Sequence, residues 1–219
     1  MIFYFSATGN NQYIAERIAG KTGDRIISIR EAVDQNHVEV TLADEENLGF
    51  VIPTYFGGFP EIVTTFLDSL HVKYAQNNYI FFVATYGSAT GNIGLEAKDK
   101  IGALGQSLDA SFSVKMVDNW NPGFDMTDQA YIHRAEEKAE EQIPHVLEAI
   151  TRKEHCLEIG KTVLALLQNQ ARKMYERARR TDNFSVGCEC IHCGICEKQC
   201  PSHAIRLLIL FVISVSFIF

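Results

Sequence analysis

Five of the six cysteines lie close together near the end of the chain, and four of them follow the spacing Cys-x2-Cys-x2-Cys-x3-Cys-Pro. Thiolates two residues apart can surround one cubane iron–sulfur cluster, and the proline turns the chain after the last thiolate. We therefore predict an iron–sulfur site whose ligands are Cys190, Cys193, Cys196 and Cys200. This spacing is the most specific signal in the sequence.

The same cysteines admit two other interpretations. A structural zinc site is one, because His192 and His203 lie near these cysteines and zinc accepts mixed Cys/His ligands. A reactive Cys-x2-Cys dithiol is the other, although four spaced cysteines exceed what thiol exchange needs. Cys188 falls outside this spacing, and we interpret it as a spare thiol. Cys156 lies far from the other cysteines in the sequence.

A second candidate site is the hydroxyl- and amide-rich segment 6–11. It separates a short apolar run from an amphipathic segment, so we expect a loop between a buried strand and a helix. A helix N-terminus offers unpaired N–H groups and a partial positive charge, which together bind phosphate. The segment lacks the lysine of nucleotide-hydrolysing loops, so it suits the terminal phosphate of a mononucleotide. The residues with suitable groups are Ser6, Thr8, Gly9, Asn10 and Asn11.

Two further loops, 53–60 and 85–92, each combine an aromatic residue with glycines. Both follow predicted strands, and ligands of open α/β sheets bind outside the carboxyl ends of the strands. An aromatic side chain can stack on a flat ring, while glycine lets the main chain approach it. Trp120, which follows the last predicted strand, is a candidate for another wall of the same site.

The elements that position these loops alternate between strand and helix, which is typical of an α/β fold with a doubly wound parallel sheet. The expected strands are 2–5, 25–29, 48–52, 79–84 and 112–117. The expected helices are 13–19, 61–70, 93–108 and 128–150. A further helix is expected over 162–180, with Val163, Leu167, Ala171, Met174 and Ala178 on its apolar face. We interpret that helix as a packed connector. The alternative is that its arginines form a docking surface for an acidic partner.

Residues 1–150 resemble the flavodoxin family, because Ser6-Ala7-Thr8-Gly9-Asn10 after the first strand is similar to its FMN phosphate loop. Segments 53–58 and 85–92 are similar to the two loops that hold the isoalloxazine in that family. The resemblance implies a five-stranded parallel sheet of order 2-1-3-4-5 and FMN bound without a covalent link. It also implies phosphate contacts from Ser6, Thr8, Gly9, Asn10 and Asn11. The ring site would be lined by Thr54, Tyr55, Phe56, Gly57, Tyr86, Gly87 and Asn92.

Together, the two halves resemble bacterial flavodoxin–ferredoxin fusions. We expect an FMN-binding domain over 1–150, a connecting helix over 151–182, a partial ferredoxin-like 4Fe-4S domain over 183–207 and an apolar tail over 208–219. The chain departs from the family because a two-cluster ferredoxin needs a second cysteine run. The fourth ligand is therefore undecided. It is Cys200 or Cys188, or it is missing, which would leave a three-iron cluster.

The apolar tail occupies the place where the family would carry its second cysteine run. We expect that the tail replaces that run, through a frameshift or an assembly error in the gene. A membrane-dipping anchor and a buried core strand are the alternatives. The apolar run 207–219 is shorter than the roughly 20 residues of a spanning helix, so membrane association is not expected.

The charge is unevenly distributed along the chain. Residues 1–150 carry 10 basic and 21 acidic side chains, a net −11, whereas 151–182 carry 8 and 4, a net +4. An acidic body argues against a nucleic-acid binder. The clustered cysteines and the absence of a basic, apolar leader predict a reducing compartment, the cytoplasm.

These features favour an electron-transfer protein that passes single electrons between FMN and a 4Fe-4S cluster and exchanges them with redox partner proteins. One alternative is an enzyme, an FMN-dependent NAD(P)H or quinone reductase on the same fold. The other is a zinc-stabilised binding module. Nothing in the sequence indicates an oligomeric state.

Overall fold

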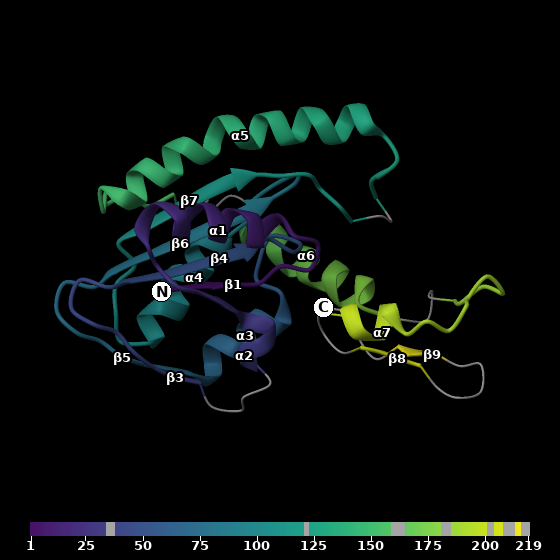
Figure 1. Cartoon of the computed structure of the whole chain (residues 1–219), viewed down its shortest axis with the longest axis horizontal. Coiled ribbons are helices and arrows are strands. Elements are labelled where there is room, and N and C mark those ends of the chain that lie inside the picture. The colour runs from purple at the N-terminus through teal and green to yellow at the C-terminus, as the bar shows by residue number, and fades with distance from the viewer. Residues whose placement is uncertain are drawn as a thin grey trace.

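The computed structural model of the chain describes residues 1–33, 38–120, 123–158, 165–180, 185–200, 204–207 and 213–215. Its centre is a five-stranded parallel sheet of order β2-β1-β4-β6-β7 (Figure 1). The strands are Ile2–Tyr4 (β1), Ile26–Ser28 (β2), Asn47–Pro53 (β4), Tyr79–Tyr86 (β6) and Ala110–Lys115 (β7). They are the five strands expected from the sequence, in the expected order 2-1-3-4-5, so the doubly wound fold is confirmed.

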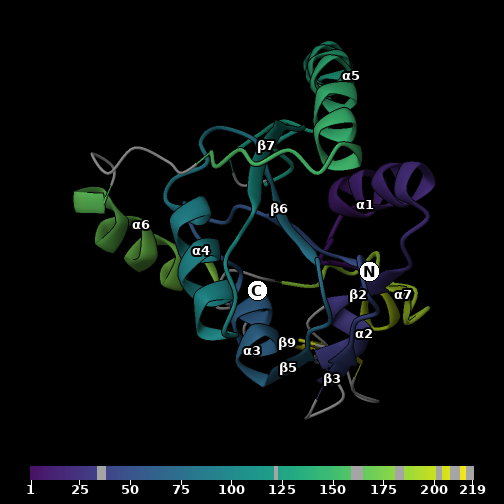
Figure 2. The same cartoon turned by 90° about the vertical axis from the view of Figure 1, so that its left-hand side faces the viewer.

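Both faces of this sheet are covered, which explains why its central strands are apolar at nearly every position. Successive residues of β4 contribute to opposite sides: Phe50 belongs to one buried cluster and Val51 to the other. Helices α1 (Asn10–Thr22) and α5 (Gln129–Thr151) pack on the Val51 side. Helices α2 (Ile29–Val33), α3 (Glu61–Ser69) and α4 (Ile93–Ala103) pack on the Phe50 side (Figure 2).

Capping residues mark the end of α1 and the start of α5. Helix α1 ends at Gly23, whose φ of 75° is left-handed and whose N–H donates to Ala19 O at 2.8 Å. Helix α5 begins after Asp128, whose carboxylate accepts from Tyr131 N at 3.0 Å. The expectation of one helix over 93–108 was wrong at its end. Helix α4 stops at Ala103, because Gly105 takes a left-handed φ of 84°.

Three short elements beside the main sheet were not predicted. Strands β3 (Val38–Thr41) and β5 (Leu70–Lys73) form a separate parallel pair, and α2 directly follows β2. In β3 the valines are buried and the alternate residues are exposed, so the period-2 pattern is present but spans only four residues. A pattern this short is hard to distinguish from a loop.

The C-terminal third adds helix α6 (Ala165–Ala178), helix α7 (Ile195–Gln199) and the antiparallel pair β8 (Ile205–Leu207) and β9 (Ile213–Val215). All four lie on the side toward which the strands of the main sheet point (Figure 1). Of the expected apolar tail, Ile213–Val215 pairs with β8, while 208–212 and 216–219 lie outside the described residues. Val163 and His203 lie outside them too. Among the described residues, no helix has both the length and the apolar character needed to cross a bilayer.

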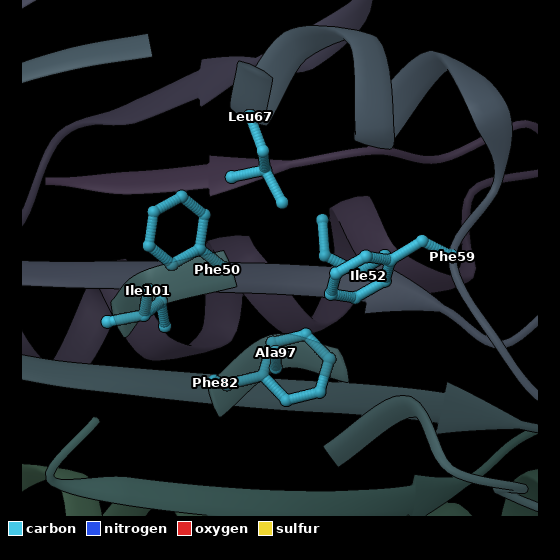
Figure 3. A pocket seen from close by; sticks show the side chains of 7 residues that line it. All are labelled: Phe50, Ile52, Phe59, Leu67, Phe82, Ala97 and Ile101. Atoms are coloured by element: carbon cyan, nitrogen blue, oxygen red, sulfur yellow. The ribbon is translucent and has the colours of Figure 1, made fainter. Parts of the chain in front are cut away.

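A small hollow lies inside the Phe50 side of the core, between the sheet and helices α3 and α4 (Figure 3). All of its lining side chains are apolar: Phe50, Ile52, Phe59, Leu67, Phe82, Ala97 and Ile101. A ligand site needs polar groups to orient its ligand. We therefore assign this hollow to core packing.

We expect Gly49→Ala to destabilise the protein by about 1–3 kcal/mol through overpacking in the core. Gly49 lies in β4, and a Cβ there would come within 2.2 Å of the buried Phe81 ring. Gly20→Ala in α1 is the control, because a Cβ there meets no atom within 4 Å. Denaturant unfolding measures both. Equal stability of the two variants would contradict the packing described here.

Candidate functional site

The first candidate loop runs from Ser6 into the first turn of α1. Gly9 stands directly before the helix with a φ of 101°, which glycine adopts without steric cost. Its N–H donates to Ser6 Oγ at 3.0 Å, and its carbonyl accepts from Tyr13 N at 2.9 Å. A Cβ at Gly9 would meet no atom within 4 Å. Open space therefore lies where the positive end of the α1 dipole favours an anion.

The amides of Asn10 and Asn11 tie this loop to the neighbouring strands. Asn10 Nδ2 donates to the carbonyl of Val117, after β7, at 3.1 Å. Thr85 Oγ1 of β6 donates to Asn11 Oδ1 at 2.9 Å, and both side chains are buried. These bonds position the loop. Ser6 is half-buried, and Thr8 and Gly9 are exposed, so a ligand can reach this part of the loop.

The second loop makes a tight turn at Phe56. Tyr55 and Gly58 exchange two main-chain hydrogen bonds, of 3.0 and 3.1 Å. Between them Phe56 and Gly57 take φ angles of 49° and 81°, the pattern of a type I′ turn. A positive φ is rare for an aromatic residue and persists only where its surroundings hold it, which is common at functional sites.

The second and third loops touch through their main chains. The carbonyl of Gly57 accepts from Asn92 N at 2.9 Å, and Asn92 stands directly before α4. A Cβ at Gly91 would lie 2.2 Å from Gly57 Cα. The two expected ring-binding loops are thus brought together, and both need glycine at the point where they meet.

The third loop also packs on the segment after β7. A Cβ at Gly87 would lie 2.2 Å from the Asp118 side chain, and Ser88 Oγ donates to Asp118 Oδ2 at 3.1 Å. Asn119 Nδ2 donates to Thr8 Oγ1, which links this segment to the first loop as well. The sequence interpretation did not include Asp118 or Asn119. Their place directly after the fifth strand was the signal that could have found them.

Aromatic rings gather beside the second loop. The Phe56 and Trp120 rings meet edge to face, with centroids 5.6 Å apart at 78°, so Trp120 lies beside the second loop and its role as a wall stays a prediction. The Tyr175 ring of α6 lies 5.9 Å from the Phe56 ring. The prediction of the apolar face of this helix was wrong at one position, because Met174 is exposed and Tyr175 is buried. Tyr175 is buried because it packs on aromatic residues of another segment, which helical periodicity does not reveal.

Thr54 and Tyr55 give this site its buried polar groups. Thr54 Oγ1 is buried and has no hydrogen-bond partner among the described residues. A buried hydroxyl without a partner is costly, so a ligand that bonds to it would recover that cost. Burial, with a smaller contribution from Tyr175, raises the pKa of Tyr55 far above its usual value. Tyr55 therefore stays protonated and neutral.

These observations fit FMN as the group held at this edge. The open N-terminus of α1 suits its phosphate. The orphaned Thr54 hydroxyl and the adjacent aromatic residues suit a flat ring with hydrogen-bonding atoms. Of the expected ring-site residues, Thr54, Tyr55, Phe56 and Gly57 share one turn. Tyr86 ends β6 and Gly87 follows it, while Asn92 bonds to Gly57 through its N–H.

The cysteine segment begins a separate region after α6. None of the six cysteines, all of which lie in the described part of the chain, forms a disulfide. Cys200 is buried and its Sγ accepts from Ala204 N at 3.3 Å, while Cys193 and Cys196 are exposed and Cys190 is half-buried. Among the described residues, no three His, Cys, Asp or Glu side chains gather into a metal-binding group. The structure therefore does not bring the four expected ligands together.

The donor chemistry of this segment nevertheless fits an iron–sulfur cluster. Four thiols at the expected spacing are the ligands that such a cluster takes. His192 and Gly194 have φ angles of 55° and 72°, so the chain bends sharply on both sides of Cys193. Metal sites of this kind close as the metal binds, because free thiols alone supply no attraction that gathers them. Arg30 Nη2 donates to Lys198 O at 3.2 Å, which connects the segment to the main domain.

Comparison with known proteins finds two family models on this chain. A model described as a flavodoxin domain matches residues 1–133. A model described as a 4Fe-4S binding domain matches residues 189–206, which include all four cysteines of the spacing. A search of curated proteins finds no match.

Three solved structures illustrate the likeness. A putative flavoprotein from Bacteroides uniformis is 16% identical, with 55% of this chain and 92% of that chain covered and a TM-score of 0.37. An azoreductase from Bacillus anthracis is 10% identical, with 69% and 96% covered and a score of 0.40. A flavodoxin from Streptococcus pneumoniae is 16% identical, with 66% and 97% covered and a score of 0.36. All three scores are low, so the family match carries the assignment.

We expect Gly91→Ala to weaken the binding of added FMN roughly tenfold or more, because the new Cβ forces the second and third loops apart. Gly105→Ala is the matched control. Gly105 also has a positive φ, of 84°, but a Cβ there meets no atom within 4 Å. Fluorescence titration with FMN measures both. Equal FMN affinity of the two variants would show that the contact between the loops does not shape the site.

Proposed function

Because the chain belongs to the flavodoxin domain family, we propose that it is an electron-transfer protein that uses FMN and an iron–sulfur cluster. The observation that carries this proposal is the match of one chain to both a flavodoxin domain and a 4Fe-4S binding domain. When bound, FMN and the cluster supply the capacity to accept and release single electrons. The protein supplies binding, orientation and shielding for both groups.

Each loop at the carboxyl edge has a separate part in holding FMN. Ser6, Thr8, Gly9, Asn10 and Asn11 bind the phosphate at the start of α1, as the resemblance implied. The side chains of Asn10 and Asn11 also fix the loop to its neighbours. The flat ring is held by contacts from seven residues of the second and third loops, as the resemblance implied. Those residues are Thr54, Tyr55, Phe56, Gly57, Tyr86, Gly87 and Asn92. The orphaned hydroxyl of Thr54 and the strained turn at Phe56 support this assignment.

Cys190, Cys193, Cys196 and Cys200 are the proposed cluster ligands. The 4Fe-4S binding match over 189–206 includes all four residues.

We also propose the domain division 1–150, 151–182, 183–207 and 208–219. The five-stranded sheet with its covering helices within the first range supports it, as does the separate helix α6 within the second. Six cysteines that form no disulfide suit a reducing compartment, so we propose that the protein is cytoplasmic and exchanges electrons with redox partner proteins.

We expect Thr54→Val to have opposite effects on stability and on FMN binding. Removal of an unsatisfied buried hydroxyl should stabilise the FMN-free protein by about 1 kcal/mol, while loss of a hydrogen bond to the ring weakens FMN binding roughly three- to tenfold. Thr64→Val in α3 is the control, because Thr64 Oγ1 is also buried without a partner among the described residues but lies outside the loops. Thermal unfolding and FMN titration measure the two effects. FMN affinity unchanged in Thr54→Val would remove Thr54 from the site.

Anaerobic reconstitution tests the proposed cluster. We expect the wild-type chain to take up iron together with acid-labile sulfide, and Cys193→Ser to lose most of both, because it removes a proposed ligand. Cys156→Ser should retain both, since Cys156 is an exposed thiol outside the spacing. Iron, sulfide and zinc analysis per chain gives the answer. Zinc without sulfide would identify a structural zinc site instead.

A further inference from the structure

Among the described side chains of helix α6, Tyr175 is the buried one, and it contacts the turn of the proposed flavin site. Tyr175 is 2% exposed, whereas the other described side chains of this helix from Asn169 onward are exposed or half-buried. Its ring lies 5.9 Å from Phe56 at 40° and 6.4 Å from Tyr55 at 55°. The helix therefore packs on the turn of the second loop, although the two segments are far apart in the sequence.

Polar contacts hold Tyr175 in this position. The Glu61 N–H, at the start of α3, donates to the Tyr175 hydroxyl at 3.1 Å. The guanidinium groups of Arg172 and Arg179 lie over the Tyr175 ring, 5.1 and 5.4 Å from its centroid. Arg172 Nη1 also donates to Phe59 O at 3.0 Å, and Arg179 forms an ion pair with Glu61. The side chain of Tyr175 is thus held both through its ring and at its hydroxyl.

Phe56 needs such support because its main chain has a positive φ, which is unfavourable for a residue that carries a Cβ. Its φ is 49°, and the tight turn alone does not determine where its ring lies. The Phe56 ring packs against the rings of Trp120 and Tyr175, with centroid distances of 5.6 and 5.9 Å. Removal of Tyr175 would leave Trp120 as a neighbour of Phe56 and open space where the helix was packed.

We propose that Tyr175 is a positioning residue for the flavin site, which holds Phe56 in place and so makes FMN binding depend on the connecting helix. This inference rests on the proposed function. Tyr175 lies outside the family match over 1–133, so the flavodoxin-like domain is completed by a residue from the segment that leads to the cysteines. Helix α6 thus contacts the flavin loop within the part of the chain that leads to the cysteines.

The test uses the full chain and two readouts. Trp120 is the single tryptophan, so its emission reports the Phe56 ring beside it without any FMN. We expect Tyr175→Ala and Tyr175→Leu to move this emission to longer wavelength, and to weaken FMN binding roughly three- to tenfold, the range of an aromatic contact. Tyr175→Phe keeps the ring and should behave like wild type in both readouts. Met174→Ala, at an exposed position on the same helix, is the control.

The readouts separate failure of this inference from failure of the proposed function. Unchanged emission in both Tyr175→Ala and Tyr175→Leu would overturn the inference, and so would a shifted emission with unchanged FMN affinity. Thermal unfolding of the FMN-free variants shows whether they are folded. If Tyr175→Ala does not fold, Tyr175→Leu serves in its place, because it retains an apolar side chain. Wild-type protein that binds no FMN would overturn the proposed function. A shift of Trp120 emission in that case would still support the contact between Tyr175 and Phe56.

Discussion

The main chains of Gly57 and Gly91 touch where the loops after β4 and β6 meet, and the carboxyl edge of the sheet is arranged around this contact. Any Cβ at Gly91 would enter the space of Gly57 Cα. The contact lets Asn92 donate its N–H to the Gly57 carbonyl at the start of α4. Phe56, the residue before Gly57, has a left-handed φ of 49° in the same turn. The proposed ring site therefore depends on Gly91, where a Cβ would clash, and on Gly57, whose φ of 81° favours glycine.

The edge is closed by contacts between segments that are distant in the sequence. Asn11 bonds to Thr85, Asn119 to Thr8, and Tyr175 packs on Phe56. A parallel sheet brings the carboxyl ends of its strands to one edge, so these loops become neighbours whatever their order along the chain. Side-chain bonds then fix their relative positions. Preorganisation of this kind is what a protein contributes to a cofactor that carries its own chemistry.

The sequence was sufficient for the five main strands and the loops that follow them, because apolar runs and glycine-rich turns are strong local signals. The order of the strands followed from the resemblance to flavodoxins. The sequence was not sufficient for contacts made across the fold. Met174 was expected on the buried face of its helix, but the aromatic turn at Phe56 selects Tyr175 instead. The strand Val38–Thr41 was missed because four residues carry too short a pattern. Cysteine spacing predicts which thiols bind a cluster, but it does not place them, and the described structure does not bring them together.

Electron exchange between FMN and the cluster in one chain is what the proposed function requires. A reductive titration of the anaerobically reconstituted full chain, followed by absorbance for the flavin and by EPR for the cluster, measures it. We expect both signals to respond, with electrons distributed between the two groups according to their potentials. A flavin band that bleaches completely while no iron–sulfur signal appears at any stage would contradict the proposal. The chain would then be a flavodoxin-like protein whose cysteine segment takes no part in electron transfer.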